Sequence, residues 1–213
     1  MRLYVMAAAC LIALVGCGSG GTGGGSGSSN TLPLPDGFKR IGGSANGISV
    51  AVPEGWTTID LSSDSDFASK LEKSGLSGSA LQQAKAGLEA LKANKAIYAT
   101  DPDSIKQSSN QFATNLNGFC QASVGASADA LIEEAKKQLA SVNAQVSEAA
   151  EVPLGASKGV RIKYALPMAA VTVKGTQYYV PSDKGKTCIV TLSTDLDGKD
   201  ALFDQIGGTV APV

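Results

Sequence analysis

Histidine is absent from this 213-residue sequence, and its absence excludes several kinds of chemistry at once. Histidine is the side chain most often used as a general base near neutral pH, the commonest protein metal ligand, and a member of the Ser-His-Asp triad. The sequence therefore argues against a triad hydrolase and against a histidine-based metal centre. We expect no catalytic residues, no metal and no cofactor.

Aromatic residues and surplus charge are also scarce. Phe, Trp and Tyr make up 5% of the chain, so the core must consist mainly of Ala, Val, Leu and Ile. The formal net charge is −1, and without Arg2 the chain has 17 Lys and Arg residues against 19 Asp and Glu. A nucleic-acid interface requires a concentrated basic face, which this balance does not provide.

The sequence also lacks an apolar run of the roughly 20 residues that a membrane-spanning helix needs. Its longest uncharged segment near the start, residues 3–15, follows Arg2 and has the length of a signal-peptide core. That segment ends in Leu14-Val15-Gly16-Cys17, which resembles the lipobox of bacterial lipoproteins, where a peptidase cuts before the cysteine. The resemblance implies a signal peptide over residues 1–16, diacylglycerol on the sulfur of Cys17, and attachment to the outer face of the cell membrane. Cys10, in the same apolar run, keeps open the alternative of an ordinary signal with an incidental cysteine.

Two further cysteines, Cys120 and Cys188, remain in the exported part of the chain. An oxidising compartment favours disulfides, and two thiols allow one intramolecular pairing. We therefore predict a Cys120–Cys188 disulfide; two buried reduced thiols are the alternative.

Composition divides the rest of the chain into a tether and one domain. Residues 17–36 carry the lipidated cysteine, a run of Gly and Ser, and then Pro33 and Pro35, which together describe a flexible linker. Residues 37–213 have the length of a single domain with one core.

The first strand signal of this domain carries a family resemblance. Residues 48–52 alternate in polarity and end at Pro53, and Glu54-Gly55-Trp56 follows. This run resembles the opening of PsbP-like domains, most closely the LpqN-type lipoproteins of actinobacterial envelopes. Asn115-Leu116-Asn117, after an alternating strand, is a second match in the right order. The resemblance implies an α/β/α sandwich and a role in binding or assembly.

Periodicity independently predicts an α+β domain with a largely antiparallel sheet of about seven strands flanked by helices. Helices are expected as a hairpin over 65–93, over 128–142 after a capping Ser127, and over 198–206. The other expected strands are 95–100, 112–120, 144–152, 159–166, 170–180 and 186–193, the last four forming a meander.

Three side chains of this pattern have both a structural and a functional interpretation. Trp56 is expected to pack in the core, with ligand stacking as the alternative. Asn115 and Asn117 point to the same face of their strand. They are expected to bond neighbouring backbone or to face solvent; lining a polar site is the alternative.

These observations leave three functional hypotheses. The first is a membrane-tethered, non-catalytic binding or accessory lipoprotein of the cell envelope, whose partner is an unidentified envelope protein or small ligand. The second is a lipid- or glycolipid-carrying lipoprotein with an apolar cavity. The third is an enzyme that works without histidine.

Overall fold

The structure is a computed structural model, and it describes residues 33–59, 61, 78–123, 127–154, 157–168, 171–182 and 185–213. The predicted signal peptide, Cys17 and most of the linker lie outside the described residues. So does the first helix of the predicted hairpin.

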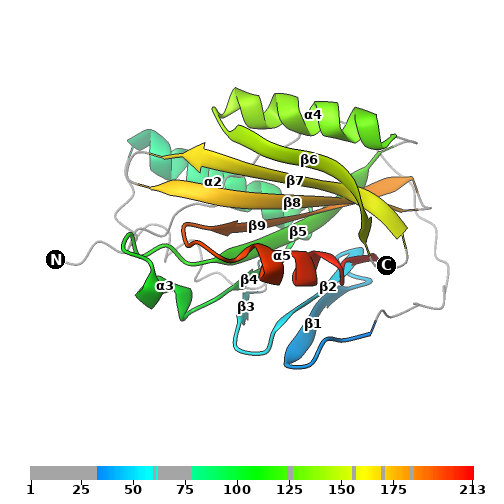
Figure 1. Cartoon of the computed structure of the whole chain (residues 1–213), viewed down its shortest axis with the longest axis horizontal. Coiled ribbons are helices and arrows are strands. Elements are labelled where there is room, and N and C mark those ends of the chain that lie inside the picture. Colours follow the sequence, from blue (N-terminus) through cyan, green and yellow to red (C-terminus); the bar gives the residue numbers. More distant parts are fainter. Residues whose placement is uncertain are drawn as a thin grey trace.

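A seven-stranded antiparallel sheet forms the centre of the domain (Figure 1), as the sequence predicts. Its order is β3-β4-β5-β9-β8-β7-β6. The four strands of this sheet that come last in the chain lie in sequence order across it, which confirms the predicted meander. The strand bounds are β3 Thr57–Ile59, β4 Ile97–Thr100, β5 Asn115–Ala122, β6 Gln145–Leu154, β7 Ser157–Pro167, β8 Thr172–Ser182 and β9 Lys186–Thr194.

A second, three-stranded sheet covers one face of the first, and the sequence did not predict it. It consists of β1 (Phe38–Gly43), β2 (Ile48–Pro53) and β10 (Ala211–Pro212), in the order β1-β2-β10. Residues 48–52 do form a strand, as expected, but that strand is the middle one of this small sheet. Trp56 follows it and is 4% exposed within the core, so its predicted packing role is confirmed.

Helix α5 (Asp200–Gly207) covers the same face beside the small sheet (Figure 1). Its Phe203 and Ile206 are buried together with side chains of both sheets. This layer of the predicted sandwich therefore consists of α5 together with the small sheet. The β10 strand ties the end of the chain to β2, and this long-range pairing has no local sequence signal.

Helices α2 (Gly78–Ala93) and α4 (Ala128–Ser141) belong to the opposite face. The hydroxyl of Ser127 accepts a hydrogen bond of 3.3 Å from the backbone N–H of Ala130, which confirms the predicted cap of α4. Leu139 of α4 is buried against β7 side chains, while α2 buries Leu88 and Leu91 in a smaller cluster. A short helix, α3 (Ser104–Gln107), lies between β4 and β5.

One carboxylate of α5, that of Asp204, makes polar contacts with the large sheet. Asp204 Oδ1 accepts hydrogen bonds from the Tyr178 hydroxyl at 2.7 Å and from Arg161 Nη1 at 2.8 Å. The Tyr178 ring then lies directly over Gly207, where an added Cβ would be 2.4 Å from the ring carbon Cζ. Gly207 is therefore required by packing.

The central strands β5 and β9 are also joined covalently. Cys120 and Cys188 are direct cross-strand partners, their sulfur atoms are bonded, and their Cα atoms lie 3.9 Å apart. The sheet register therefore brings together the two cysteines that the sequence predicts to be bonded. Its oxidation in the native protein stays a prediction.

Gly207→Ala is expected to lower the free energy of unfolding by about 1–3 kcal/mol, because the new methyl group overpacks the Tyr178 ring. The matched control is Gly208→Ala, whose Cβ would approach no atom closer than 3.4 Å at a φ of −63°. Urea denaturation of both variants measures the difference. Equal stabilities would show that Tyr178 does not need this glycine.

Reduction of the Cys120–Cys188 bond is expected to lower the free energy of unfolding by about 4 kcal/mol, because the bond restricts the unfolded chain across 68 residues. Denaturation with and without a reducing agent measures the loss. The double variant Cys120→Ser, Cys188→Ser should be insensitive to the reducing agent. A wild-type protein equally insensitive to it would contradict the disulfide.

Candidate functional site

Asn115 and Asn117 lie in β5 at the centre of the large sheet and are buried, with 2% and 4% of their surfaces exposed. The Asn115 amide donates one hydrogen bond of 2.9 Å from Nδ2 to the Ala113 carbonyl. Asn115 Oδ1 and Asn117 Nδ2 are buried and have no hydrogen-bond partner. The expectation that these side chains face solvent is therefore wrong. The expectation of backbone bonding is confirmed for the Nδ2 end of Asn115.

The two asparagines belong to a larger group of buried polar side chains, which we call the polar patch. Strand register places Ser193 opposite Asn115, Thr191 opposite Asn117, and Gln177 opposite Thr191. Opposed residues of an antiparallel pair point to the same face, so these side chains share the face that α2 and α4 belong to. The polar patch thus comprises Asn115, Asn117, Gln177, Thr191 and Ser193, all of them buried.

Internal hydrogen bonding satisfies part of the polar patch. Gln177 Nε2 donates a long hydrogen bond of 3.4 Å to Thr191 Oγ1, and the Tyr179 hydroxyl donates one of 2.9 Å to Gln177 Oε1. The asparagines remain the incompletely bonded members. Leaving a buried donor or acceptor without a partner costs about 1–3 kcal/mol, so an arrangement of this kind calls for an explanation.

Apolar clusters flank the polar patch on both sides. Tyr98 lies directly opposite Asn117 and packs with the buried leucines of α2. Ile162, opposite Gln177, is buried in the cluster beneath α4. Phe119, two residues along β5 from Asn117, packs against both clusters. The patch is therefore a hydrogen-bonding, uncharged surface bordered by aromatic rings.

Sequence reasoning identified two of the five patch residues. Asn115 and Asn117 stood out through the Asn-Leu-Asn element, which resembles the PsbP-like pattern, and through their shared strand face. Thr191, Ser193 and Gln177 were missed, because Thr and Ser are ordinary strand residues and the chain gives no local sign of which strand lies beside β5. Alternating polar positions within the predicted strand 186–193 were the available signal.

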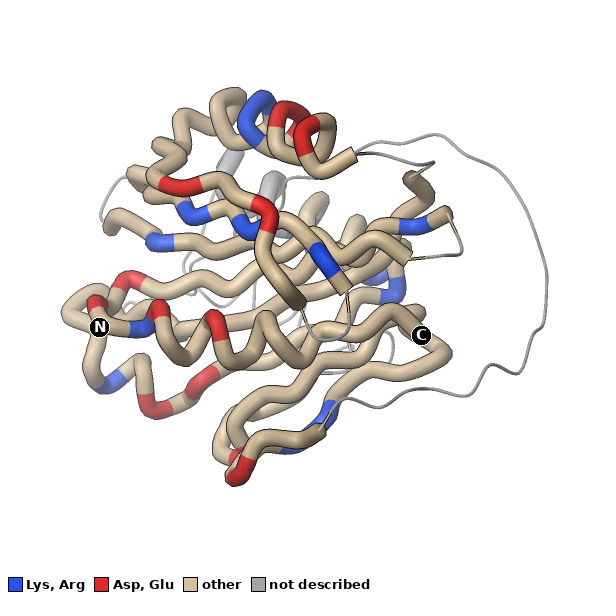
Figure 2. Tube along the Cα trace, turned by 45° about the vertical axis from the view of Figure 1, so that its right-hand side comes forward, with Lys and Arg blue, Asp and Glu red and all other residues tan. Residues whose placement is uncertain are grey.

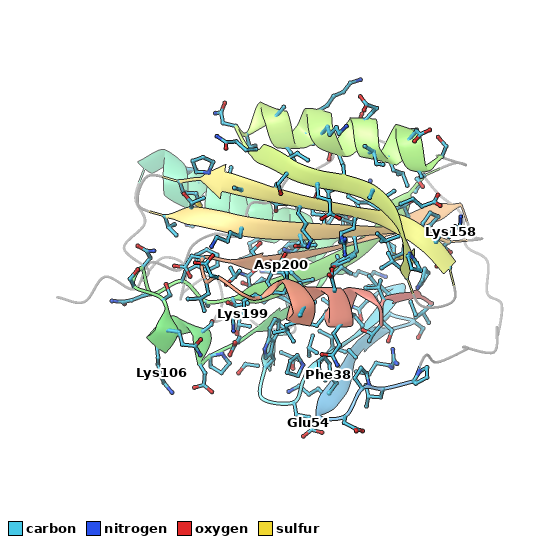
Figure 3. The ribbon with its side chains drawn as sticks, in the orientation of Figure 1. Phe38, Glu54, Lys106, Lys158, Lys199 and Asp200 are labelled. Carbon is cyan, nitrogen blue, oxygen red and sulfur yellow. A yellow bond between two sulfur atoms is a disulfide. The ribbon has the colours of Figure 1, made fainter. Side chains whose placement is uncertain are left out.

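A cleft of about 210 Å³ opens on the opposite face, at the start of α5. It is lined in part by Lys163, Lys174, Lys199, Asp197 and Asp200. Figure 3 marks Lys199 and Asp200 where the helix begins.

Ion pairs occupy the charged groups of this cleft. Lys163 Nζ lies 2.9 Å from Asp200 Oδ1, Lys174 pairs with Asp197, and Lys199 Nζ lies 3.8 Å from a carboxylate oxygen of Asp101. The cleft is smaller than the roughly 300–1,000 Å³ of usual ligand pockets. Its charged lining also differs from the apolar cavity that a lipid carrier requires.

Outside this cleft, positively and negatively charged residues are mixed. Figure 2 shows positive and negative residues interspersed along α4 and the strands beneath it. Within the described ranges, no group of three Cys, Asp or Glu side chains is arranged to hold a metal ion. No helix in the described part of the chain is long and apolar enough to cross a membrane.

Three tyrosines in the sheet have raised pKa values. Burial raises the pKa of Tyr98 to about 12 from its ordinary value of 10.0. Burial also raises the pKa of Tyr179, with a smaller contribution from the negative charge of Glu134. The pKa of Tyr178 is raised by burial and then by its hydrogen bond to Asp204. The folded domain therefore favours the neutral phenols.

Stability should decrease at alkaline pH for this reason. Because the folded pKa values lie above those of the unfolded chain, the stabilisation is fully present below pH 10 and is lost as pH rises toward the folded values. The decrease approaches about 1.4 kcal/mol per pH unit for each tyrosine. Urea denaturation from pH 9 to pH 11 measures it, and Tyr98→Phe should show a shallower decrease. A stability that stays constant over this range would contradict the assignment.

Comparison with known proteins supports the fold. No protein-family model and no curated protein matches the chain. The solved structures similar to it include the cyanobacterial PsbP protein (CyanoP) of Synechocystis sp. PCC 6803. This likeness has a TM-score of 0.51 at 15% identity and covers 91% of this chain and 98% of that one.

Two other solved structures are more distant. A protein of Bacteroides thetaiotaomicron VPI-5482 has a TM-score of 0.49 at 10% identity, covering 83% of this chain and 49% of that one. LpqN of Mycobacterium tuberculosis, described as involved in cell envelope biogenesis, has a TM-score of 0.34 at 11% identity, covering 84% and 80%. Both TM-scores are below 0.5, so we draw no conclusion about function from these two structures. The likeness to the cyanobacterial protein confirms the expected PsbP-like α+β fold.

Proposed function

We propose that this chain is a lipid-anchored, non-catalytic binding or accessory protein on the outer face of the cell membrane. In this proposal residues 1–16 are removed as a signal peptide, Cys17 carries the lipid, and residues 17–36 tether a binding domain formed by residues 37–213. Two acyl chains on one cysteine hold a domain of this size stably at a membrane, at about 0.8 kcal/mol per buried methylene group.

The observation that carries the binding role is the incompletely bonded polar patch at the centre of the large sheet. Buried amides are normally fully hydrogen-bonded, and departures from this rule concentrate at functional sites. Asn115 Oδ1 and Asn117 Nδ2 are such departures, and they lie among uncharged side chains. A group of this composition binds through hydrogen bonds and offers no general base or nucleophile pair, which supports a binding role over catalysis.

The resemblance of residues 14–17 to a lipobox supports the proposed membrane location. The tether over residues 17–36 supports access of the domain to a partner. The Gly/Ser-rich composition of residues 18–30 predicts a root-mean-square reach of ~20 Å, enough to hold the domain clear of the lipid headgroups. The partner is an envelope protein or a small envelope ligand. The lipid-carrier alternative gains no support from the cleft at α5, because its lining is charged.

Cys17→Ala is expected to release the protein from the membrane fraction, because it removes the acceptor of the lipid. Cys10→Ala is the matched control and should leave the protein membrane-bound. Fractionation of cells followed by immunodetection measures both. A Cys17→Ala protein that stays attached would refute the anchor, whereas crosslinking of intact cells tests the presence of a protein partner separately.

A further inference from the structure

We propose that the polar patch is a binding site for a neutral carbohydrate. This inference rests on the proposed binding role and adds the class of ligand to it. Asn115, Asn117, Gln177, Thr191 and Ser193 provide amide and hydroxyl groups on one sheet face.

The chemistry of the patch selects a neutral, polyhydroxylated ligand. Each sugar hydroxyl both donates and accepts hydrogen bonds, so it can satisfy an amide donor and an amide acceptor in one ring. Asn117 Nδ2 and Asn115 Oδ1 are one of each, and both lack a partner. Their residues lie two positions apart in β5, about 7 Å along the strand, a separation that one sugar ring with its hydroxyl groups can span. A charged ligand would find no counter-charge among the five patch residues.

Aromatic side chains border the polar patch and suit the apolar face of a sugar ring. Tyr98 lies opposite Asn117, Phe119 follows it on the same face, and Tyr179 donates to the patch amide of Gln177. Aromatic rings have large apolar faces, and sugar rings present C–H groups above and below their hydroxyls. The polar patch and its aromatic border therefore match both surfaces of one ligand.

Burial of the patch means that a ligand enters only when the layer over this sheet face opens. Hydrogen exchange of the backbone amides in β5 and β9 reports such local opening.

The test uses the full chain, purified as the cell makes it, with glucose, galactose, arabinose and maltose as probes. Saturation-transfer NMR detects binding of each sugar, and amide hydrogen exchange detects protection of β5 and β9, which carry four of the five patch residues. We expect transfer to at least one sugar and slower exchange in β5 and β9 when that sugar is present.

Thr191→Val and Asn117→Leu are the test variants. Each removes hydrogen-bonding groups while keeping much of the side-chain volume, and affinity should fall by at least about tenfold in each, the value of one buried hydrogen bond. Lys174→Ala, in the cleft on the opposite face, is the matched control and should bind as the wild type does.

Thermal unfolding separates a binding role from a structural one. Asn117→Leu should unfold at the same temperature or higher, because it removes an unpartnered buried amide. The proposal is overturned if no sugar of the panel binds the wild type, or if the variants bind as well as it does. Failure here leaves the membrane anchor intact, because the fractionation of Cys17→Ala is independent of any sugar.

Discussion

The pairing of β5 with β9 is the constraint on which the rest of the structure depends. These strands meet at the middle of the large sheet and contact one another through eight register positions, from Asn115 with Ser193 to Ala122 with Lys186. The same register sets the two halves of the sheet side by side and brings Cys120 opposite Cys188. On the other face it aligns Asn115 and Asn117 with Ser193 and Thr191. A shift by one residue would send both sets of side chains to the wrong faces.

The two faces of the large sheet differ in the side chains that they carry and in how they are covered. The face that carries the cysteines is closed by the small sheet and α5, which are held by a continuous apolar cluster and by the contacts of Asp204. The other face is divided, with apolar clusters at its sides and uncharged polar groups between them. Stability is concentrated on the first face and at the edges of the second. Two of the three unpartnered buried side-chain atoms in the described residues lie in the polar centre, the third being Asp195 Oδ1. This incomplete bonding supports a binding function.

Sequence patterns predicted the local elements of this fold well and its long-range arrangement in part. The helix at 128–142 was predictable because a capping serine precedes a regular apolar period, and the strands from β6 to β9 because alternation and turns are encoded locally. The small sheet was not predictable, because β10 pairs with β2 across more than 150 residues and is only two residues long. The polar patch was predictable only in part, again because it depends on long-range strand pairing. Its asparagines lie in one local sequence element, whereas its other members can be recognised only when the neighbouring strands are known.

The proposed binding of a neutral sugar at the polar patch can be tested by crystallography. The most direct measurement is a crystal structure of the protein grown with whichever sugar of the panel gives the strongest saturation transfer. We expect ordered sugar density within hydrogen-bond distance of Asn115 Oδ1 and Asn117 Nδ2. Density for water alone at those two atoms, with the sugar bound elsewhere or absent, would contradict it.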